Sequence, residues 1–252
     1  MYTIHFKKLF YILIIFSSLH VYAETTRIML LGDSITYDSN VNDKYVQARP
    51  TSIRNGYRND LWYKLKNANY NVDFVGSLAA GQAISPAFDV DNEGHPGWSS
   101  YDIANSMYGF LTQNQPDIIL LHIGSNDNSS SIIGVEDILN EIDIYENNYN
   151  HTIKVILALI IDRVNHSAVT SSFNINLKVM AERRISNGDK IRIIDMEHNA
   201  GLRYNSSDMA DYIHPNNSGY AKMATLWFNA LEETFKEHDN AFLIPIYGLI
   251  LN

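Results

Sequence analysis

Residues 27–34 read Arg-Ile-Met-Leu-Leu-Gly-Asp-Ser, an apolar run that ends in glycine, aspartate and serine. A short run that is apolar at successive positions predicts a strand buried on both faces, as in a parallel sheet. Glycine permits a sharp turn after such a strand. The serine then stands beyond the carboxyl end of the strand, which is where open parallel sheets bind their ligands. This stretch therefore indicates a fold class and also where the chemistry should lie.

The same pattern recurs along the chain. Four further strand-like runs lie at 72–75, 117–123, 154–161 and 191–194. Segments with apolar residues at helical spacing lie at 57–68, 103–111, 135–149, 173–185 and 220–235. Strands that alternate with helices predict βαβ units and a parallel sheet covered on both faces. We expect one α/β domain, a three-layer α/β/α sandwich around a central, mostly parallel five-stranded sheet.

The composition excludes several classes of protein. The 252 residues contain no cysteine, which excludes a disulfide scaffold, thiol catalysis and cysteine-based zinc sites. Hydrophobic residues make up 46% and charged residues 19%, as in an ordinary folded domain. The formal net charge of −9 argues against nucleic acid as a partner. The length suffices for one domain with a substantial core.

The two ends of the chain differ from the part between them. Residues 1–23 have the order of a secretory signal: Lys7 and Lys8, then an apolar run, then a small-residue site ending at Ala23. We expect cleavage after Ala23 and a secreted or periplasmic protein, with an uncleaved anchor as the alternative. The apolar run is too short to span a bilayer, and no stable membrane span is expected. Residues 24–240 then form the domain.

Residues 241–252 form an apolar tail of unknown role, in which Pro245 is expected to break a helix. Three interpretations stay open for this tail: a strand or clip packed on the domain, a remnant of a sorting signal, or a surface that contacts a partner.

Two motifs near opposite ends of the chain indicate a serine nucleophile and its base. Ser34 lies in a Gly-Asp-Ser-Ile-Thr stretch directly after the first strand, although Asp33 and Ser34 also suit a simple helix cap. Asp211 and His214 are three residues apart, so they can hydrogen-bond within one turn. A serine needs a base to take its proton, and that base needs a carboxylate to orient it. A lone histidine before a proline is otherwise more often structural.

Two glycine-containing loops supply candidates for stabilising an oxyanion. Asn126, in Gly-Ser-Asn-Asp after the run at 117–123, offers a neutral amide donor. The second loop reads Gly94-His95-Pro96-Gly97-Trp98, where a glycine N–H is free to approach a substrate and the tryptophan offers an apolar wall. Ordinary turns are the alternative for both loops.

In their joint order these motifs resemble the GDSL/SGNH hydrolases, over residues 27 to about 235. Within that superfamily, the stretches at 27–36, 73–77, 91–98 and 214–220 resemble carbohydrate esterase family three, the acetyl xylan esterase group. There is no G-x-S-x-G elbow, so the sequence does not resemble the standard α/β-hydrolases.

The resemblance implies a role for each matching residue. Ser34 is expected to be the nucleophile, His214 the general base and Asp211 the residue that orients His214. The oxyanion hole is expected from the Ser34 N–H, the Gly97 N–H and the Asn126 side chain, with Gly94 as the alternative to Gly97. Asp33, His95 and Trp98 are expected to bind substrate. The implied acyl transfer needs no metal and no cofactor.

The function that follows from the resemblance is a secreted serine esterase that removes O-acetyl groups from an acetylxylan-like carbohydrate. Its partner is then an acetylated polysaccharide or another small-acyl ester, and no nucleic acid. Two alternatives stay open: a lipid or thioester acyl hydrolase on the same fold, and a non-catalytic glycan-binding domain. The oligomeric state is not predicted.

Four other residue groups have simpler interpretations. Asp89, Asp91 and Glu93 resemble the opening of an EF-hand loop, but position twelve is serine, so an acidic turn is favoured over calcium. Asp208 is a rival to Asp211 at a poorer spacing. Asp127 is expected to hold its loop, and His122 to be a core residue.

Overall fold

The computed structural model describes residues 25–250, with side chains described up to Glu237. The predicted signal segment, residues 1–23, and the last two residues of the tail lie outside the described part of the chain.

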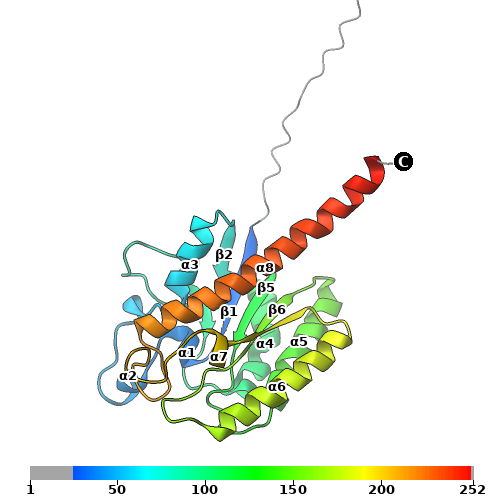
Figure 1. Ribbon diagram of the computed structural model, residues 1–252. Helices are drawn as coiled ribbons and strands as arrows, with labels where there is room; N and C mark the ends of the chain where they lie inside the picture. The colour runs from blue at the N-terminus through cyan, green and yellow to red at the C-terminus, as the bar shows by residue number, and fades with distance from the viewer. Residues whose placement is uncertain (1–24, 251–252) are drawn as a thin grey trace, which may run out of the picture.

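A single sheet forms the centre of the molecule (Figure 1). Its strands are β1 (Thr26–Gly32), β2 (Val72–Val75), β3 (Leu78–Ala79), β4 (Asp91–Gly94), β5 (Ile118–His122), β6 (Lys154–Leu159) and β7 (Ile191–Asp195). The strand order is β3-β4-β1-β5-β6-β7, and β2 also pairs with β1. All pairs are parallel except β3 with β4.

The sheet has seven strands, where the sequence predicted five. Of the two strands that were not predicted, β4 shares one edge of β1 with β2, and β3 pairs with the far side of β4. The first half of β1 pairs with β2, and its last two residues pair with β4. Strand β4 reads Asp-Asn-Glu-Gly, so it carries no apolar signal, although Asn92 and Glu93 are fully buried.

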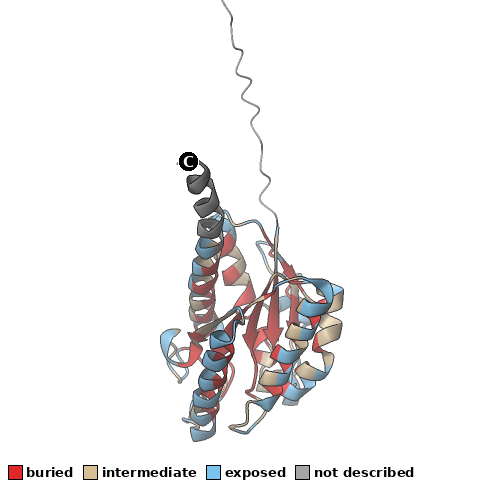
Figure 2. Ribbon diagram, turned by 90° about the vertical axis from the view of Figure 1, so that its right-hand side faces the viewer, coloured by how far each residue is buried: buried red, intermediate tan, exposed pale blue. Residues whose placement is uncertain are grey.

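Helices cover both faces of the sheet (Figures 1 and 2). They are α1 (Ser34–Tyr37), α2 (Val41–Tyr45), the 3-10 helix Thr51–Ile53, α3 (Arg58–Asn67), α4 (Ser100–Asn114), α5 (Ile133–Tyr149), α6 (Ala168–Ser186), α7 (Met196–Asn199) and α8 (Asn217–Ile250). Alternate residues of β1 enter two separate cores. Met29 and Leu31 pack with α4, α5 and α6, whereas Ile28 and Leu30 pack with α3 and α8. The predicted three-layer α/β/α architecture is therefore confirmed.

Helix α8 runs from Asn217 to Ile250 and so passes through Pro245, where the sequence predicted a break. A proline removes one backbone donor and disfavours a helix interior, but the backbone continues helical here. Within the described residues, no helix is both long enough and apolar enough to cross a membrane.

The strand register brings three loops together at one edge of the sheet. Gly32 of β1 pairs with Gly94 of β4 on one side and with His122 of β5 on the other. The segments that follow these residues, which begin with Asp33, His95 and Ile123, therefore leave the sheet side by side. A Cβ at Gly32 would lie 2.5 Å from the His122 carbonyl oxygen, so glycine is required where the strands meet.

Candidate active site

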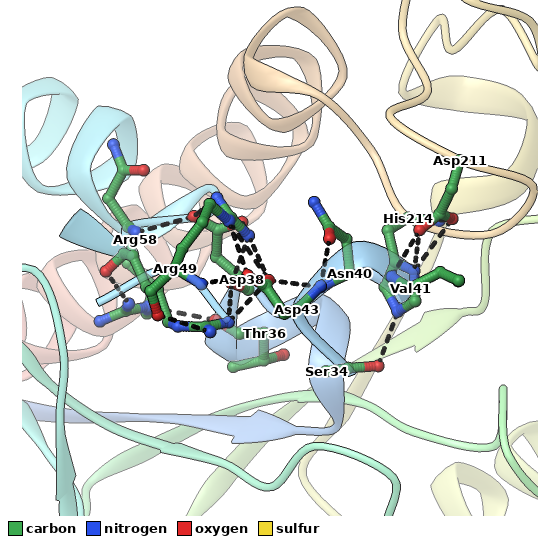
Figure 3. Close-up of polar contacts among 12 residues, drawn as sticks. Ser34, Thr36, Asp38, Asn40, Val41, Asp43, Arg49, Arg58, Asp211 and His214 are labelled. Carbon is green, nitrogen blue, oxygen red and sulfur yellow. Dashed lines mark hydrogen bonds and ion pairs between the residues drawn. The ribbon is translucent and has the colours of Figure 1, made fainter. Parts of the chain in front are cut away.

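Three side chains from the two ends of the domain form one hydrogen-bonded chain (Figure 3). The Ser34 Oγ lies 2.9 Å from the His214 Nε2. On the other side of the ring, the His214 Nδ1 lies 2.8 Å from the Asp211 Oδ2 and 3.0 Å from its Oδ1. Ser34 begins the first turn of α1, directly after β1, and the other two residues belong to the loop before α8. This arrangement allows a proton to pass from the serine hydroxyl to the imidazole, with a carboxylate behind it.

The Asp211 carboxylate is held by backbone donors as well as by His214. Its Oδ1 accepts from the N–H groups of Ile213 at 2.9 Å and of His214 at 2.8 Å. Its Oδ2 accepts from the Val41 N–H at 2.8 Å, across a separation of 170 residues. Partial burial opposes ionisation, but the hydrogen bonds from His214, Val41 and Ile213 outweigh it and hold the pKa of Asp211 well below its ordinary value. Asp211 is therefore ionised at neutral pH.

An ion-pair network fixes the segment that supplies the Val41 N–H (Figure 3). Asn40 and Asp43 form a reciprocal capping box at the start of α2. Arg49 donates to Asp38 at 2.9 Å and to Asp43 at 2.8 Å, and Arg54 also donates to Asp43 at 2.8 Å. The side chains of Asp38 and Asp43 are nearly inaccessible to solvent. The network therefore ties α2 to the segment that follows Ser34.

At the end of β4 and in the loop that follows it, the structure distinguishes between the two candidate glycines. The Gly94 N–H donates to the Asn92 Oδ1 at 3.1 Å, and a Cβ at Gly94 would lie 2.7 Å from the Tyr37 backbone nitrogen. Gly97 is exposed, has a φ of 85°, and has no atom within 4 Å of the position of a Cβ. Its backbone therefore borders open space, whereas the Gly94 N–H is already engaged.

Asn126 lies in the loop that follows β5. Its Nδ2 donates one hydrogen to the Trp98 carbonyl oxygen at 2.8 Å. A primary amide carries two hydrogens, so the second remains available to a ligand. The same hydrogen bond links the Asn126 loop to the Gly97–Trp98 loop.

His95 and Trp98, both predicted to bind substrate, contact each other. Their rings stack with centroids 4.1 Å apart, and the other ring near His95 is that of Phe110, at 5.1 Å. The His95 Nε2 also lies 2.6 Å from an oxygen of the buried Glu93. His95 is thus engaged by three protein groups and supports Trp98, which remains partly accessible.

Asp33, the third residue predicted to bind substrate, is fully buried. Its Oδ1 accepts from the Ile35 N–H at 2.9 Å, so it caps α1. A buried carboxyl beneath the serine cannot touch a polysaccharide, and the structure corrects this expectation. The sequence pattern placed Asp33 at the right edge of the sheet but could not show which way its side chain points.

Three of the remaining acidic and histidine residues have the structural contacts that the sequence suggested. Asp127 accepts from the Ser100 N–H at 2.8 Å and from its hydroxyl at 2.5 Å, so it anchors its loop to α4. Asp208 pairs with Lys222 at 2.6 Å rather than with His214. His122 is fully buried, and burial lowers its pKa to about 4.

Carboxylates and histidines that could hold a metal ion gather elsewhere. In the described part of the chain, two such overlapping groups occur, made of Asp162, His166 and Glu197 and of Asp195, Glu197 and His198. Both lie at the ends of β6 and β7. The Asp89, Asp91 and Glu93 set is not one of them, because Asp91 and Glu93 belong to strand β4 and Glu93 is bonded to Ser77 and His95. The EF-hand resemblance thus has no counterpart in the fold.

Comparison with known proteins identifies the family. Residues 30–222 match the family model of the GDSL-like lipase/acylhydrolase family. The chain belongs to this family. The matched residues include Ser34, Asn126, Asp211 and His214, so the hydrogen-bonded chain above lies within the family's own domain. A GDSL-type domain is a carboxylic ester hydrolase, and the resemblance given by the sequence motifs is confirmed.

Individual similar proteins are consistent with this family. A multidomain esterase of Ruminococcus flavefaciens is 31% identical, over 86% of this chain and 30% of that protein. The chain thus spans about a third of this curated relative. Among solved structures, an acetyl esterase mutant with acetate ion is 26% identical, with a TM-score of 0.69, over 84% of this chain and 99% of that one.

Two further structures carry the name of carbohydrate esterase family 3. The one from Talaromyces cellulolyticus is 27% identical, with a TM-score of 0.68, over 84% of this chain and 99% of that one. The one from Clostridium thermocellum is 23% identical, with a TM-score of 0.66, over 82% of this chain and 94% of that one, and shows likeness of fold.

Sequence reasoning missed three contributors to this site. The Val41 N–H is a backbone group, and no pattern of side chains in the sequence predicts its role. The capping box of Asn40 and Asp43 is a readable signal for α2, but the ion pairs of Arg49 depend on the fold. Tyr212 stands between Asp211 and His214 with 53% of its surface exposed, and its position in the motif could have drawn notice.

Proposed function

We propose that the protein is a carbohydrate O-acetyl esterase that acts outside the cytoplasm, with an acetylated polysaccharide of the acetylxylan type as its substrate. The observation that carries the catalytic part is the continuous hydrogen-bonded chain from Ser34 through His214 to Asp211. The preference for acetylated carbohydrate is supported by the acetyl esterase and the family 3 carbohydrate esterase among the similar structures.

In the proposed mechanism, the Ser34 hydroxyl attacks the carbonyl carbon of the acetyl ester while its proton moves to the His214 Nε2. Asp211, ionised and fixed by backbone donors, stabilises the imidazolium that results. The imidazolium then gives its proton to the departing sugar oxygen, and an acetyl-enzyme remains. Water then attacks this ester while its proton moves to His214. The imidazolium returns that proton to the Ser34 oxygen as acetic acid leaves, which restores the serine hydroxyl.

The negative oxygen that develops in each step needs hydrogen-bond donors close to Ser34. We assign the oxyanion hole to the N–H groups of Ser34 and Gly97 and to the second hydrogen of the Asn126 amide. Gly94 is set aside because its N–H already donates to Asn92. Donors fixed in advance stabilise the charge as it forms, without reorganisation during the reaction.

The surface next to the triad suits a hydroxylated substrate. An open depression of about 350 Å³ lies beside the loop that carries Asp211 and His214. Its lining includes Asn40, Arg49, Asn216 and Ser218 but none of the three triad residues, so it could hold a part of the substrate remote from the scissile ester. The rings of Tyr212 and Trp98 belong to the acid–base loop and to the oxyanion loop respectively. Aromatic faces and polar groups together are the elements with which proteins hold sugars, whereas a long acyl chain needs an apolar channel.

Two measurements test this function. Residues 24–252 are expected to release acetate from acetylated xylan and to hydrolyse p-nitrophenyl acetate, and Ser34→Ala is expected to lower kcat by at least about a thousandfold. Ser206→Ala, which changes an exposed serine of the loop before α8, is the matched control and should retain activity. An unchanged rate in Ser34→Ala would eliminate the mechanism.

Acyl-chain length separates the two enzymatic candidates. A steep fall in kcat/KM from p-nitrophenyl acetate to the octanoate supports the sugar esterase, and the reverse order supports a lipid acyl hydrolase. Export is tested by expressing the full chain and determining the N-terminus of the protein recovered outside the cytoplasm, which is expected to be Glu24.

A further inference from the structure

Asp33 precedes the proposed nucleophile, yet no step above uses it. Its side chain is fully buried, and only one of its oxygens has a hydrogen-bond partner, the Ile35 N–H. The other oxygen, Oδ2, is buried without a partner, and so is the Ser125 Oγ, whose hydroxyl faces this carboxyl without a hydrogen bond of good geometry. Buried carboxylates normally have their lone pairs satisfied, so this arrangement requires an explanation.

Capping of α1 does not explain the choice of aspartate. Asparagine caps helices about as well as aspartate does and places no charge in the interior. At this position the charge carries a cost, because burial raises the pKa of Asp33 to about 6, against the hydrogen bond from Ile35 and the attraction of His214. The folded protein therefore loses stability as pH rises from about 4 to about 6 and Asp33 ionises.

The groups that face Asp33 come from several elements. His214 attracts the carboxylate, and the hydroxyl of Ser125 favours its ionised form. Asp127, in the loop after β5, repels it. The hydroxyls of Tyr57, which directly precedes α3, and of Tyr220 on α8 are also repelled by its charge when they ionise, and burial raises the pKa of both tyrosines. Among these groups, only His214 can become a cation.

We propose that the buried negative charge of Asp33 stabilises the His214 imidazolium that forms when Ser34 gives up its proton. Asp33 directly precedes Ser34, whose Oγ lies 2.9 Å from the His214 Nε2, so the buried carboxyl is one residue away from the group that gives its proton to the imidazole. A negative charge at this position attracts the positive charge that the imidazole gains. In an interior of low dielectric constant such a charge acts over a longer distance than it does in water. The inference rests on the proposed function. Asp33 touches no substrate and acts through His214, so it is a positioning residue. In this proposal, Asp211 and Asp33 both stabilise the positive charge on the same imidazole.

Asp33→Asn tests the proposal because it retains the cap and removes only the charge. With p-nitrophenyl acetate we expect kcat to fall by about tenfold, the equivalent of one pKa unit of lost interaction, with little change in KM. We also expect the thermal midpoint to rise at pH 8, where the wild-type carboxylate is ionised, and to differ little at pH 4. A lower kcat together with a higher thermal midpoint is expected when a charged group destabilises the fold but contributes to catalysis.

A purely structural role gives a different result. If Asp33 serves only as a cap, Asp33→Asn leaves kcat unchanged, and the proposal is overturned. If Asp33→Asn lowers kcat and the thermal midpoint together at every pH, the loss reflects a damaged fold, and the proposal is again overturned. Asp137→Asn removes one charge from the exposed surface of α5 and should change neither quantity.

Ser125→Ala provides a second test that leaves Asp33 in place. The Ser125 hydroxyl favours the ionised carboxyl, so its removal leaves less of Asp33 charged between pH 6 and pH 7. We expect kcat to fall in that interval and to recover at pH 9, and a loss by one constant factor at all pH values would contradict the proposal. Full activity in Ser34→Ala would instead remove the proposed function itself.

Discussion

The groups that are expected to act on the two sides of Ser34 differ in charge. On the acid–base side, His214 is backed by the ionised Asp211, and α2 is held by the ion pairs of Arg49. On the oxyanion side, the candidate donors are neutral, and the loops that carry them are joined by the hydrogen bond from Asn126 to Trp98 and by stacked rings.

This difference follows what each side does in the proposed reaction. A cation forms on His214, and fixed carboxylates stabilise it. An anion forms at the substrate oxygen, and a nearby carboxylate would oppose it, so uncharged donors suit that side. We call the acid–base side the charged half and, after its uncharged donors, the oxyanion side the neutral half. The carboxylates of Asp127 and Glu93 in the loops of the neutral half are engaged by hydrogen bonds with Ser100, Ser77 and His95.

The largest effect should come from the charged half. Asp211→Asn removes the carboxylate and favours the wrong tautomer of His214, so kcat is expected to fall by on the order of 10⁴, with KM little changed. Steady-state kinetics with p-nitrophenyl acetate measure this. Asp208→Asn is the matched control, because Asp208 faces Lys222, and a comparable loss of kcat there would show that the acid has been misassigned.

A smaller effect is expected on the neutral half. Asn126→Ala removes one oxyanion donor, and kcat should fall by about 10²–10³. The Ser34–His214 contact does not involve this residue, so reaction of Ser34 with an organophosphate should slow while the enzyme still labels completely. Asn176→Ala, at an exposed amide of α6, should leave kcat unchanged. If Asn126→Ala retains full kcat, the neutral side contributes nothing through this amide.

The smallest effect should come from the support behind the charged half. Arg49→Met breaks the ion pairs with Asp38 and Asp43 and loosens the Val41 N–H that holds Asp211, and we expect kcat to fall by about tenfold. Arg54 still pairs with Asp43, which limits the loss.

A lysine at position 49 retains the charge, so Arg49→Lys should retain more of kcat than Arg49→Met does. Arg183→Met is the matched control: it breaks an exposed ion pair with Glu136 and should leave kcat unchanged. Equal kinetics in Arg49→Met and the wild type would show that α2 needs no such support.

The sequence predicted those parts of the fold that have an apolar signal. The runs that became β1, β5 and β6 are apolar because both of their faces are mostly buried. In β2 Asp73 is exposed, and β7 is mostly half-buried, but the other residues of these two strands are apolar enough to be predicted. Strand β4 is buried too, but its buried residues are Asn92 and Glu93, whose burial is made possible by partners that only the fold supplies. Hydrophobic patterns cannot reveal a strand of that kind.

The candidate site also contains residues that the sequence predicted and features that depend on packing. Ser34, Asp211 and His214 were predicted because their motifs follow one another in the order that resembles the GDSL/SGNH hydrolases, and because the three-residue spacing of Asp211 and His214 suits a hydrogen bond. The choice between Gly94 and Gly97 depends on which N–H is already engaged, and the position of Asp33 depends on the direction of one side chain. Both are properties of packing, and neither is encoded in a local pattern.

The separation of Ser34 from His214 has a consequence for biogenesis. The two residues are 180 positions apart, and the loop that carries His214 and Asp211 comes just before the final helix. During synthesis the nucleophile emerges first, and its base emerges only after most of the domain. A nascent chain therefore holds an unactivated hydroxyl until nearly the whole domain has been translated and α8 has docked, so the triad is complete only in the folded domain.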